Sequence, residues 1–317
     1  MFSKKRIFMS LLFTFCLVSC NSNNSYSMKT IYPFSTYLTM NFYNEPSADM
    51  DEITNIITEY DKLCDPYNAY DGINNLYSIN NSSDFIKVDA KLYDLLKFSD
   101  EMSTKTNGYF TPLIGNLSLT WKKAIESKTL PDEEVIKKEL LEIESSSIEF
   151  KDGYLVKING EANLDLGGIT KGYVLGVLKE YLIEKNITKY LINAGNSSII
   201  LGNKNGGDFK IGINNLEASF KAKETAIGTS SVDEQFFIVN DITYSHIINP
   251  FTGSAISKHE TVIVLNEDAT LMDVYSTVFM MLETSEITKI ANENSFKVIV
   301  VDDGKVTYKN SEIELYV

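Results

Sequence analysis

The chain has 317 residues, of which 44% are hydrophobic, and its formal net charge is −14. This length and apolar content are enough for one large or two modest packed units, so the composition excludes a disordered chain. The acidic balance, with no basic cluster after the first residues, excludes a nucleic-acid partner, because phosphate binding requires clustered Lys and Arg.

The first residues have the layout of a secretory signal peptide. Three basic residues at positions 4–6 precede an apolar run over residues 7–18. The run is too short to span a bilayer, which takes about 20 apolar residues. It ends in Leu-Val-Ser-Cys at residues 17–20, which resembles a bacterial lipobox, although a plain signal peptide or a core helix is the alternative. We expect a signal peptide over residues 1–19, lipid on Cys20, and a protein held extracytoplasmically at the outer face of the cell membrane, or on the periplasmic side in a Gram-negative cell.

A polar segment follows the lipobox. Residues 21–27 are almost all Asn and Ser, so we expect a flexible tether over residues 20–29 and a folded domain over residues 30–317. Cys16 would leave with the signal and Cys20 would carry lipid. Cys64 then remains alone and forms no internal disulfide, so stability must come from the core.

The first half of the domain is predicted to be one strand followed by helices. Aromatic and polar residues alternate over residues 30–42, which is typical of a strand. Apolar residues at helical spacing predict helices over residues 49–63, 90–106 and 132–144. In the first of these, Asp49 and Glu52 have the spacing of a capping box.

The second half is predicted to be mainly hairpins. Asp152-Gly153 and Asp303-Gly304 each lie between β-rich runs, and Asn240-Asp241 separates predicted strands over residues 236–239 and 242–246. Two helices interrupt the strands, over residues 169–184 and 269–282. Strands and helices mixed without strict alternation indicate an α+β fold, and the absence of a Pro-rich linker indicates a single domain.

The first candidate functional motif is Asn-Leu-Asp-Leu-Gly-Gly-Ile-Thr-Lys-Gly at residues 163–172. A predicted strand leads through paired glycines into a helix. Such a junction lets backbone approach a ligand closely and presents free amides to an anion. Taken alone, the paired glycines are more often a plain tight turn.

A second motif lies on the predicted helix over residues 269–282. Asp273 and Thr277 are four residues apart and share one face of a largely apolar helix. A lone carboxylate there is costly unless it is paired or bound to metal. A carboxylate and a hydroxyl one turn apart suit Mg²⁺, which takes oxygen ligands and keeps positions open for phosphate. The alternative is a satisfied buried Asp that caps a neighbouring loop.

Two further motifs are strand ends. Residues 244–253, Tyr-Ser-His-Ile-Ile-Asn-Pro-Phe-Thr-Gly, bring His246, one of only two histidines, to a Pro-Gly turn, where a structural role is the alternative. Asn193-Ala194-Gly195 ends another predicted strand, and Thr229 lies in a similar segment over residues 226–231. Either of these last two segments is equally an ordinary turn.

Together and in this order, the four segments resemble the ApbE family, the FAD:protein FMN transferases. Members carry D-L-G-G-x-x-K-G, then N-A-G-G, T-S-G, H-I-I-D-P-x-T-G and A-x-x-x-D-x-x-x-T, and the match runs from about Tyr32 to the C-terminus. Phe34-Ser35-Thr36 stands where the family has Met-Gly-Thr. The resemblance implies an ApbE-like (T-fold-like) single α+β domain of mixed, largely antiparallel sheets with packed helices, and the lipobox fits a family that is often lipid-anchored.

The resemblance also implies an activity, the Mg²⁺-dependent transfer of FMN from FAD onto a Ser or Thr hydroxyl of another protein, with release of AMP. The acceptors would be extracytoplasmic redox proteins of membrane electron-transfer systems. Asp273 and Thr277 would bind the metal with a backbone carbonyl near Thr170, and His246 would accept or relay the hydroxyl proton, a role that Asp273 could share. The FAD site would include Lys171 on the diphosphate, His246, and the residues Phe34, Tyr67, Asp165, Asn193, Gly195 and Thr229.

Four positions depart from the family pattern. Asn196 and Ser231 replace glycines, Asn249 replaces an acid, and Phe251 replaces a residue that is often Arg. These departures leave open a FAD-binding lipoprotein with FAD pyrophosphatase activity or without transfer activity. A solute-binding lipoprotein is a further alternative. Because the metal pair, Lys171 and His246 are retained, we expect an active enzyme.

Overall fold

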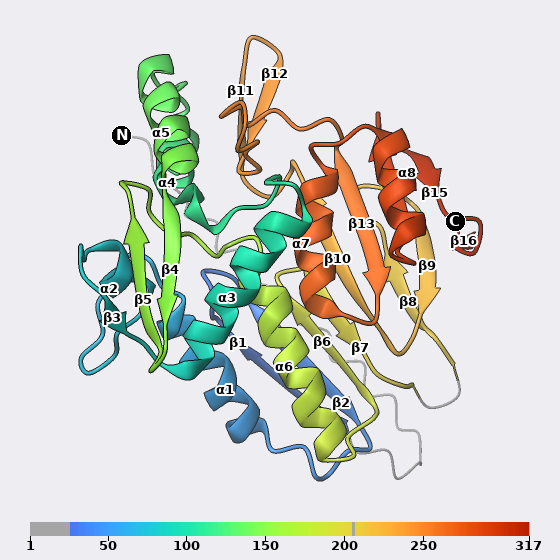
Figure 1. Ribbon diagram of the computed structural model, residues 1–317. Coiled ribbons are helices and arrows are strands. Elements are labelled where there is room, and N and C mark those ends of the chain that lie inside the picture. The colour runs from blue at the N-terminus through green and yellow to red at the C-terminus, as the bar shows by residue number, and fades with distance from the viewer. Residues whose placement is uncertain (1–25, 205–206, 317) are drawn as a thin grey trace, which may run out of the picture.

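The computed structural model describes residues 26–204 and 207–316, so the predicted signal peptide and Cys20 lie outside the described residues. Eight strands form one sheet in the order β1-β2-β6-β7-β10-β13-β14-β15 (Figure 1). Each pairing in this sheet is antiparallel. Its strands are β1 (Tyr26–Ile31), β2 (Leu38–Tyr43), β6 (Tyr190–Ala194), β7 (Ser198–Leu201), β10 (Thr225–Ser231), β13 (Thr261–Asn266), β14 (Lys297–Asp302) and β15 (Lys305–Lys309).

Helices cover one face of this sheet, and they are seen in front of it in Figure 1. They are α1 (Met50–Leu63), α3 (Ala90–Lys105), α6 (Thr170–Glu184), α7 (Ala269–Phe279) and α8 (Thr284–Glu293). Successive residues of a strand point to opposite faces, so Val262, Val264 and Val298 pack into the core under these helices. The central strands therefore supply apolar residues to both faces.

A second core lies on the opposite face of the large sheet. Ile263, Leu265 and Ile299 point to that side and pack against Phe220 of a three-stranded sheet. This sheet has the order β16-β9-β8, with β8 (Phe209–Gly212), β9 (Ser219–Ala222) and β16 (Leu315–Tyr316). Burial on both faces explains why β13 is apolar along almost its whole length.

The remaining elements lie beside the large sheet and its helices (Figure 1). They are α2 (Leu76–Asn80), the 3₁₀ helix Pro112–Ile114, α4 (Gly115–Ser127), α5 (Glu133–Ser145), the sheet of β3 (Ile86–Lys87), β5 (Leu155–Asn159) and β4 (Ser147–Lys151), and the hairpin of β11 (Phe236–Val239) and β12 (Ile242–Ser245). Trp121 of α4 packs on Tyr244 of the hairpin, with the ring centroids 5.7 Å apart. A third apolar cluster thus joins α4, α5 and the hairpin.

The predicted strand over residues 30–42 is wrong as a single element. β1 and β2 are two antiparallel strands joined by a turn in which Phe34 and Ser35 have φ of 53° and 56°. The amide of Thr36 closes the turn on the carbonyl of Pro33 at 3.0 Å. Because β1 begins at Tyr26, residues 26–29, which we assigned to the tether, lie in the sheet.

Most other predicted elements are confirmed. α1, α3, α5 and α6 lie within one residue of their predicted bounds, and the three predicted hairpin turns join β4 to β5, β11 to β12 and β14 to β15. The α+β class with antiparallel sheets is confirmed, and Cys64 is a free, buried thiol. Helix α7 ends at Phe279, three residues earlier than predicted, and α2, α4 and α8 were not predicted.

One half of the predicted capping box is present. The side chain of Asp49 accepts hydrogen bonds from the amides of Asp51 and Glu52, both at 3.0 Å. The carboxylate of Glu52 instead accepts from the hydroxyl of Tyr181 at 2.6 Å, so it ties α1 to α6 rather than capping α1. Among residues 26–204 and 207–316, no helix is both long and apolar enough to cross a membrane.

Candidate active site

A cavity of about 490 Å³ lies between the large sheet with its helices on one side and α4 and the hairpin on the other. It gathers residues from distant parts of the chain. Nine of the predicted site residues line it: Phe34, Tyr67, Asp165, Thr170, Lys171, Thr229, His246, Asp273 and Thr277. The separate motifs of the sequence therefore form one site.

Close packing of α7 brings Asp273 to the cavity wall. A Cβ on Gly172 of α6 would lie 2.4 Å from the carbonyl oxygen of Ala269, and a Cβ on Gly228 of β10 would lie 2.1 Å from the carbonyl oxygen of Met272. Side chains at these two positions would push α7 away from both α6 and β10. The two glycines thus set the position of Asp273.

The carboxylate of Asp273 is buried, with 6% of the residue exposed. It accepts hydrogen bonds from the amide of Gly172 at 2.9 Å and from the hydroxyl of Ser198 at 2.6 Å. Among the described residues, no Lys, Arg or His nitrogen lies within 4.0 Å of it. The negative charge is hydrogen-bonded but has no cationic partner, which favours a bound cation.

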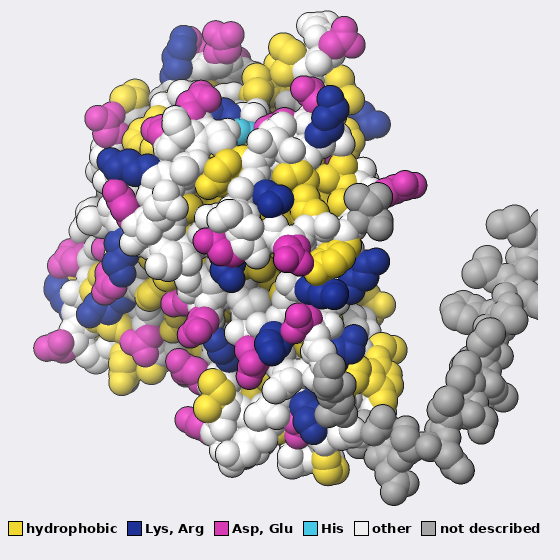
Figure 2. Space-filling model, turned by 90° about the vertical axis from the view of Figure 1, so that its right-hand side faces the viewer, with side chains coloured by type: hydrophobic (Ala, Val, Ile, Leu, Met, Phe, Trp, Pro, Cys, Tyr) yellow, Lys and Arg dark blue, Asp and Glu magenta, His cyan; other side chains and the backbone are white. Residues whose placement is uncertain are grey.

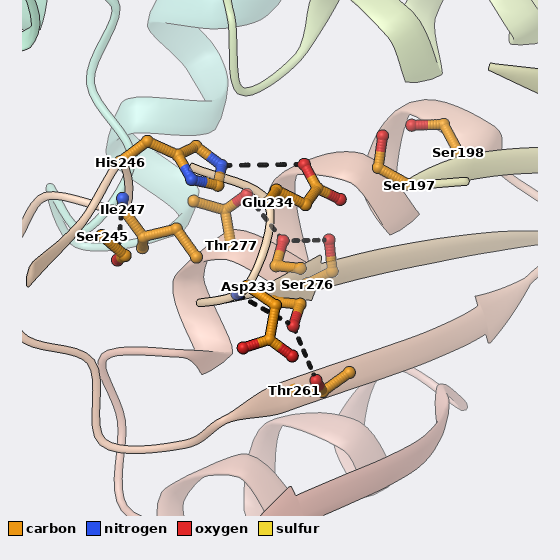
Figure 3. A network of polar contacts seen from close by, with 12 residues as sticks. Ser197, Ser198, Asp233, Glu234, Ser245, His246, Ile247, Thr261, Ser276 and Thr277 are labelled. Atoms are coloured by element: carbon orange, nitrogen blue, oxygen red, sulfur yellow. Dashed lines mark hydrogen bonds and ion pairs between the residues drawn. The ribbon is translucent and has the colours of Figure 1, made fainter. Parts of the chain in front are cut away.

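Thr277 extends the polar surface beside Asp273. Its hydroxyl lies 3.3 Å from the carbonyl oxygen of Asp273 and 3.2 Å from the hydroxyl of Ser230, which is 3.0 Å from that of Ser276 (Figure 3). In the described part of the chain, no group of three or more His, Cys, Asp or Glu residues could hold a metal. A metal at Asp273 would therefore take its other oxygens from Thr277, backbone and ligand, as Mg²⁺ does in phosphate sites.

The paired-glycine junction uses several of the amides that we expected to be free. The amides of Ile169 and Thr170 donate to the carbonyl of Leu166 at 3.1 and 3.0 Å. The Thr170 hydroxyl donates to the same carbonyl at 2.9 Å, so it is not a free ligand. The Gly172 amide binds Asp273, and Lys171 is the positively charged group that this junction supplies to the cavity.

His246 follows β12 directly and lies on the cavity wall. Its amide donates to the carbonyl of Gln235 at 3.0 Å, and its Nε2 lies 3.9 Å from a carboxylate oxygen of Glu234 (Figure 3). Desolvation, and then the positive charge of Lys171, lower the pKa of His246 to about 4. The imidazole is therefore neutral at pH 7 and able to accept a proton.

The predicted FAD-site residues Tyr67, Asp165 and Phe34 line another part of the cavity, and each has a polar or charged partner. Lys122 of α4 lies over the ring of Tyr67, 4.2 Å from its centroid, and Ser118 of the same helix donates to Asp165 at 2.7 Å. Burial, and then the charge of Asp165, raise the pKa of Tyr67 to about 12. The amide of Phe34 donates to Asp61 at 2.6 Å, which holds the left-handed turn against the cavity.

Two predicted site residues do not line the cavity. The side chain of Asn193 exchanges hydrogen bonds with Asn196, both at 2.9 Å, so it shapes the strand end. Gly195 has φ of 65°, and a Cβ there would lie 2.6 Å from the hydroxyl oxygen of Thr36. Both positions shape this strand end, and their place in a FAD site stays a prediction.

Sequence reasoning missed two contributions to the cavity wall. One is α4, which supplies Ser118, Trp121, Lys122 and Ile125, a helical spacing that was present in the sequence. The other is Glu234, which lines the cavity just before β11 and had no sequence signal.

Two of the departures from the family pattern have clear structural partners. Asn249 accepts hydrogen bonds from the amides of Phe251 and Thr252 at 2.9 and 3.2 Å, which is the turn contact that an Asp would also make. The ring of Phe251 packs edge-on against Tyr109 of the cavity wall, with centroids 5.0 Å apart. Asn249 therefore keeps the turn contact, and Phe251 adds an aromatic contact to the cavity wall.

Comparisons with known proteins give the family and the fold. A model described as the ApbE family matches residues 28–300. The FAD:protein FMN transferase of Chlamydia muridarum is 24% identical over 284 residues, covering 84% of this chain and 87% of that protein. The Vibrio cholerae protein of the same name is 25% identical over 279 residues, covering 81% and 83%. The crystal structure of the ApbE protein from Thermotoga maritima superimposes with a TM-score of 0.79 at 21% identity, covering 90% of this chain and 97% of that one.

Proposed function

Because the chain belongs to the ApbE family, we propose that it transfers FMN from FAD to a Ser or Thr hydroxyl of another protein, with release of AMP. The observation that carries the proposal is the meeting of Asp273, Thr277, Lys171 and His246 on the wall of one cavity. The curated relatives named FAD:protein FMN transferase support the donor, FAD.

Mg²⁺ would be held by the Asp273 carboxylate and the Thr277 hydroxyl, with a backbone carbonyl near Thr170. The fit rests on a buried carboxylate without a cationic partner among the described residues, and on oxygen donors one helical turn apart. When bound, the metal supplies positive charge that neutralises the phosphate oxygens of the donor.

The protein side chains would position the reactants and hold the proton. Lys171 contributes a positive charge for the diphosphate, and Tyr67 and Trp121 offer aromatic surface for the flavin ring. His246 accepts the proton of the acceptor hydroxyl. The acceptor oxygen bonds to the FMN phosphorus, the bond from that phosphorus to the bridging oxygen breaks, and AMP leaves.

The proposal includes a location. The lipobox at residues 17–20 supports lipid on Cys20 and anchoring outside the cytoplasm. The acceptors would then be extracytoplasmic redox proteins of membrane electron-transfer systems.

The test is flavin attachment by wild type and by Asp273→Asn, incubated with FAD, Mg²⁺ and an acceptor domain. Fluorescence of the acceptor on a denaturing gel measures covalent flavin. We expect Asp273→Asn to lower the rate by at least about 100-fold, because the metal loses its only charged ligand. Asp303→Asn, in the turn between β14 and β15, is the control and should act like wild type.

Two results would contradict the proposal. One is a wild-type protein that binds FAD but labels no acceptor. The other is free FMN and AMP, formed at a rate that the acceptor does not change, which identifies FAD pyrophosphatase activity instead.

A further inference from the structure

Glu234 lies on the cavity wall opposite His246 and has no role in the function proposed so far. It precedes β11, and 37% of its side chain is exposed. Figure 3 shows its carboxylate directed toward the imidazole ring, with Oε2 3.9 Å from Nε2. Glu234 precedes β11 and His246 follows β12, so pairing of these two strands brings the residues together at the open end of the hairpin.

A backbone hydrogen bond next to the pair fixes the position of His246 relative to Glu234. The amide of His246 donates to the carbonyl of Gln235, the neighbour of Glu234, at 3.0 Å. The Nδ1 atom of His246 is buried and has no hydrogen-bond partner among the described residues. Glu234 is therefore the polar side chain placed to balance a charge on this ring.

Two further charged groups lie near the pair. Lys171 on α6 acts on both His246 and Glu234, and Asp273 on α7 acts on Glu234. The positive charge of Lys171 opposes protonation of the imidazole, while the negative charge of Glu234, at the distance of an ion pair, favours it. A histidine that must take up a proton beside a lysine needs such a counter-charge.

We propose that Glu234 is a positioning residue that stabilises the imidazolium formed when His246 accepts the proton of the acceptor hydroxyl. This inference rests on the proposed function. In the step, the hydroxyl proton passes to the imidazole, the hydroxyl oxygen bonds to the FMN phosphorus, and AMP leaves with the bridging oxygen. The Glu234 carboxylate bonds to neither reactant and acts through His246.

Kinetics of flavin attachment by Glu234→Gln test the inference. This variant keeps the shape of the side chain and removes its charge. We expect kcat to fall about 10- to 100-fold, the scale on which general acid–base groups act, with the KM for FAD within about twofold of wild type. Glu234→Asp keeps the charge and should recover part of kcat. Asp233→Asn, the same charge change one residue away and directed at Asn215, should act like wild type.

A second measurement, the NMR titration of the histidines, does not depend on flavin transfer. The chain has two histidines, so NMR resolves the imidazole titration of His246 with His259 as the internal reference. Burial raises the pKa of Glu234, so we expect the His246 resonances of wild type to report the ionisation of Glu234 as a step that is absent from Glu234→Gln, and those of His259 to stay unchanged. An unchanged kcat, or an unchanged His246 titration, in a folded Glu234→Gln protein overturns the inference. A wild-type protein without transfer activity overturns the proposed function, and the titration then still decides whether Glu234 acts on His246.

Discussion

Cys64 ends α1 beneath the cavity, and only 8% of the residue is exposed. Burial raises the pKa of its thiol to about 12, which a hydrogen bond from Thr170 partly opposes. The thiolate is the reactive form, so the folded protein keeps this cysteine unreactive at neutral pH. We expect alkylation of Cys64 at pH 8 to be at least about 100-fold slower in the native protein than in urea, measured by mass spectrometry of its peptide.

The same shift has a consequence for stability. The folded state holds the Cys64 proton more tightly than the unfolded state, so this contribution is fully present below pH 9 and is lost as the pH rises toward 12. Rapid alkylation of Cys64 under native conditions would contradict the burial on which both expectations rest.

Site residues were predictable where the chemistry is local in the chain. Asp273 and Thr277 share a helix face at any tertiary arrangement, so their spacing alone placed them together. Glu234 was not predictable, because it meets His246 only after the hairpin folds. Asn193 and Gly195 lie outside the cavity lining, since the strand end that carries them forms a turn that packs on Thr36.

At the scale of elements, the contact between α7 and β10 is the one on which the site depends most. A Cβ at Gly228 would lie 2.1 Å from the carbonyl oxygen of Met272, which is backbone and cannot rotate away. We expect Gly228→Ala to lower the free energy of unfolding by about 3 kcal/mol, at the upper end of overpacking costs, as measured by urea denaturation. Flavin attachment should fall as well, because α7 carries Asp273.

Gly212→Ala is the matched control, since that glycine also lies in a strand and a Cβ there meets no atom within 4 Å. Its free energy of unfolding should change by less than about 1 kcal/mol. Equal effects of the two substitutions would show that strand propensity, rather than the close approach of α7, explains the loss at Gly228.

Elements with strong local signals were predicted, and those that depend on contacts were not. Helix α4 begins at Gly115, a poor helix former, but a Cβ there would lie 2.7 Å from the carbonyl oxygen of Asn163. The close contact with Asn163 thus requires glycine at this position, and glycine weakens the helix signal in the sequence. Likewise, the turn at Phe34 and Ser35 contains no Gly or Asn, and the Asp61 carboxylate that accepts from the Phe34 amide is far away in the sequence.

At the scale of the whole molecule, 43 Asp and Glu residues outnumber 29 Lys and Arg residues. On the face shown in Figure 2, basic and acidic side chains are interspersed, with hydrophobic side chains among them. The formal net charge is −14, and the described lysines that line the cavity are Lys122 and Lys171. Association with an anionic ligand is therefore expected to depend on these two side chains and on the proposed metal.

The proposed lipid on Cys20 would limit where the cavity can act. Five residues separate Cys20 from Tyr26, the first residue of β1, and a fully extended chain of this length spans at most about 20 Å. The domain would thus stay close to the membrane surface, where a membrane-bound acceptor is at high effective concentration.

We expect Cys20→Ser to release the protein from the membrane fraction and to lower flavin attachment to acceptors in cells by about 10-fold or more, as the tethering advantage is lost. Since the substitution changes none of the described residues that line the cavity, the same protein should label an isolated acceptor domain in solution at the wild-type rate. If Cys20→Ser protein stays with the membranes, or labels its cellular acceptors fully after release, anchoring through Cys20 is not what brings the enzyme and its acceptors together.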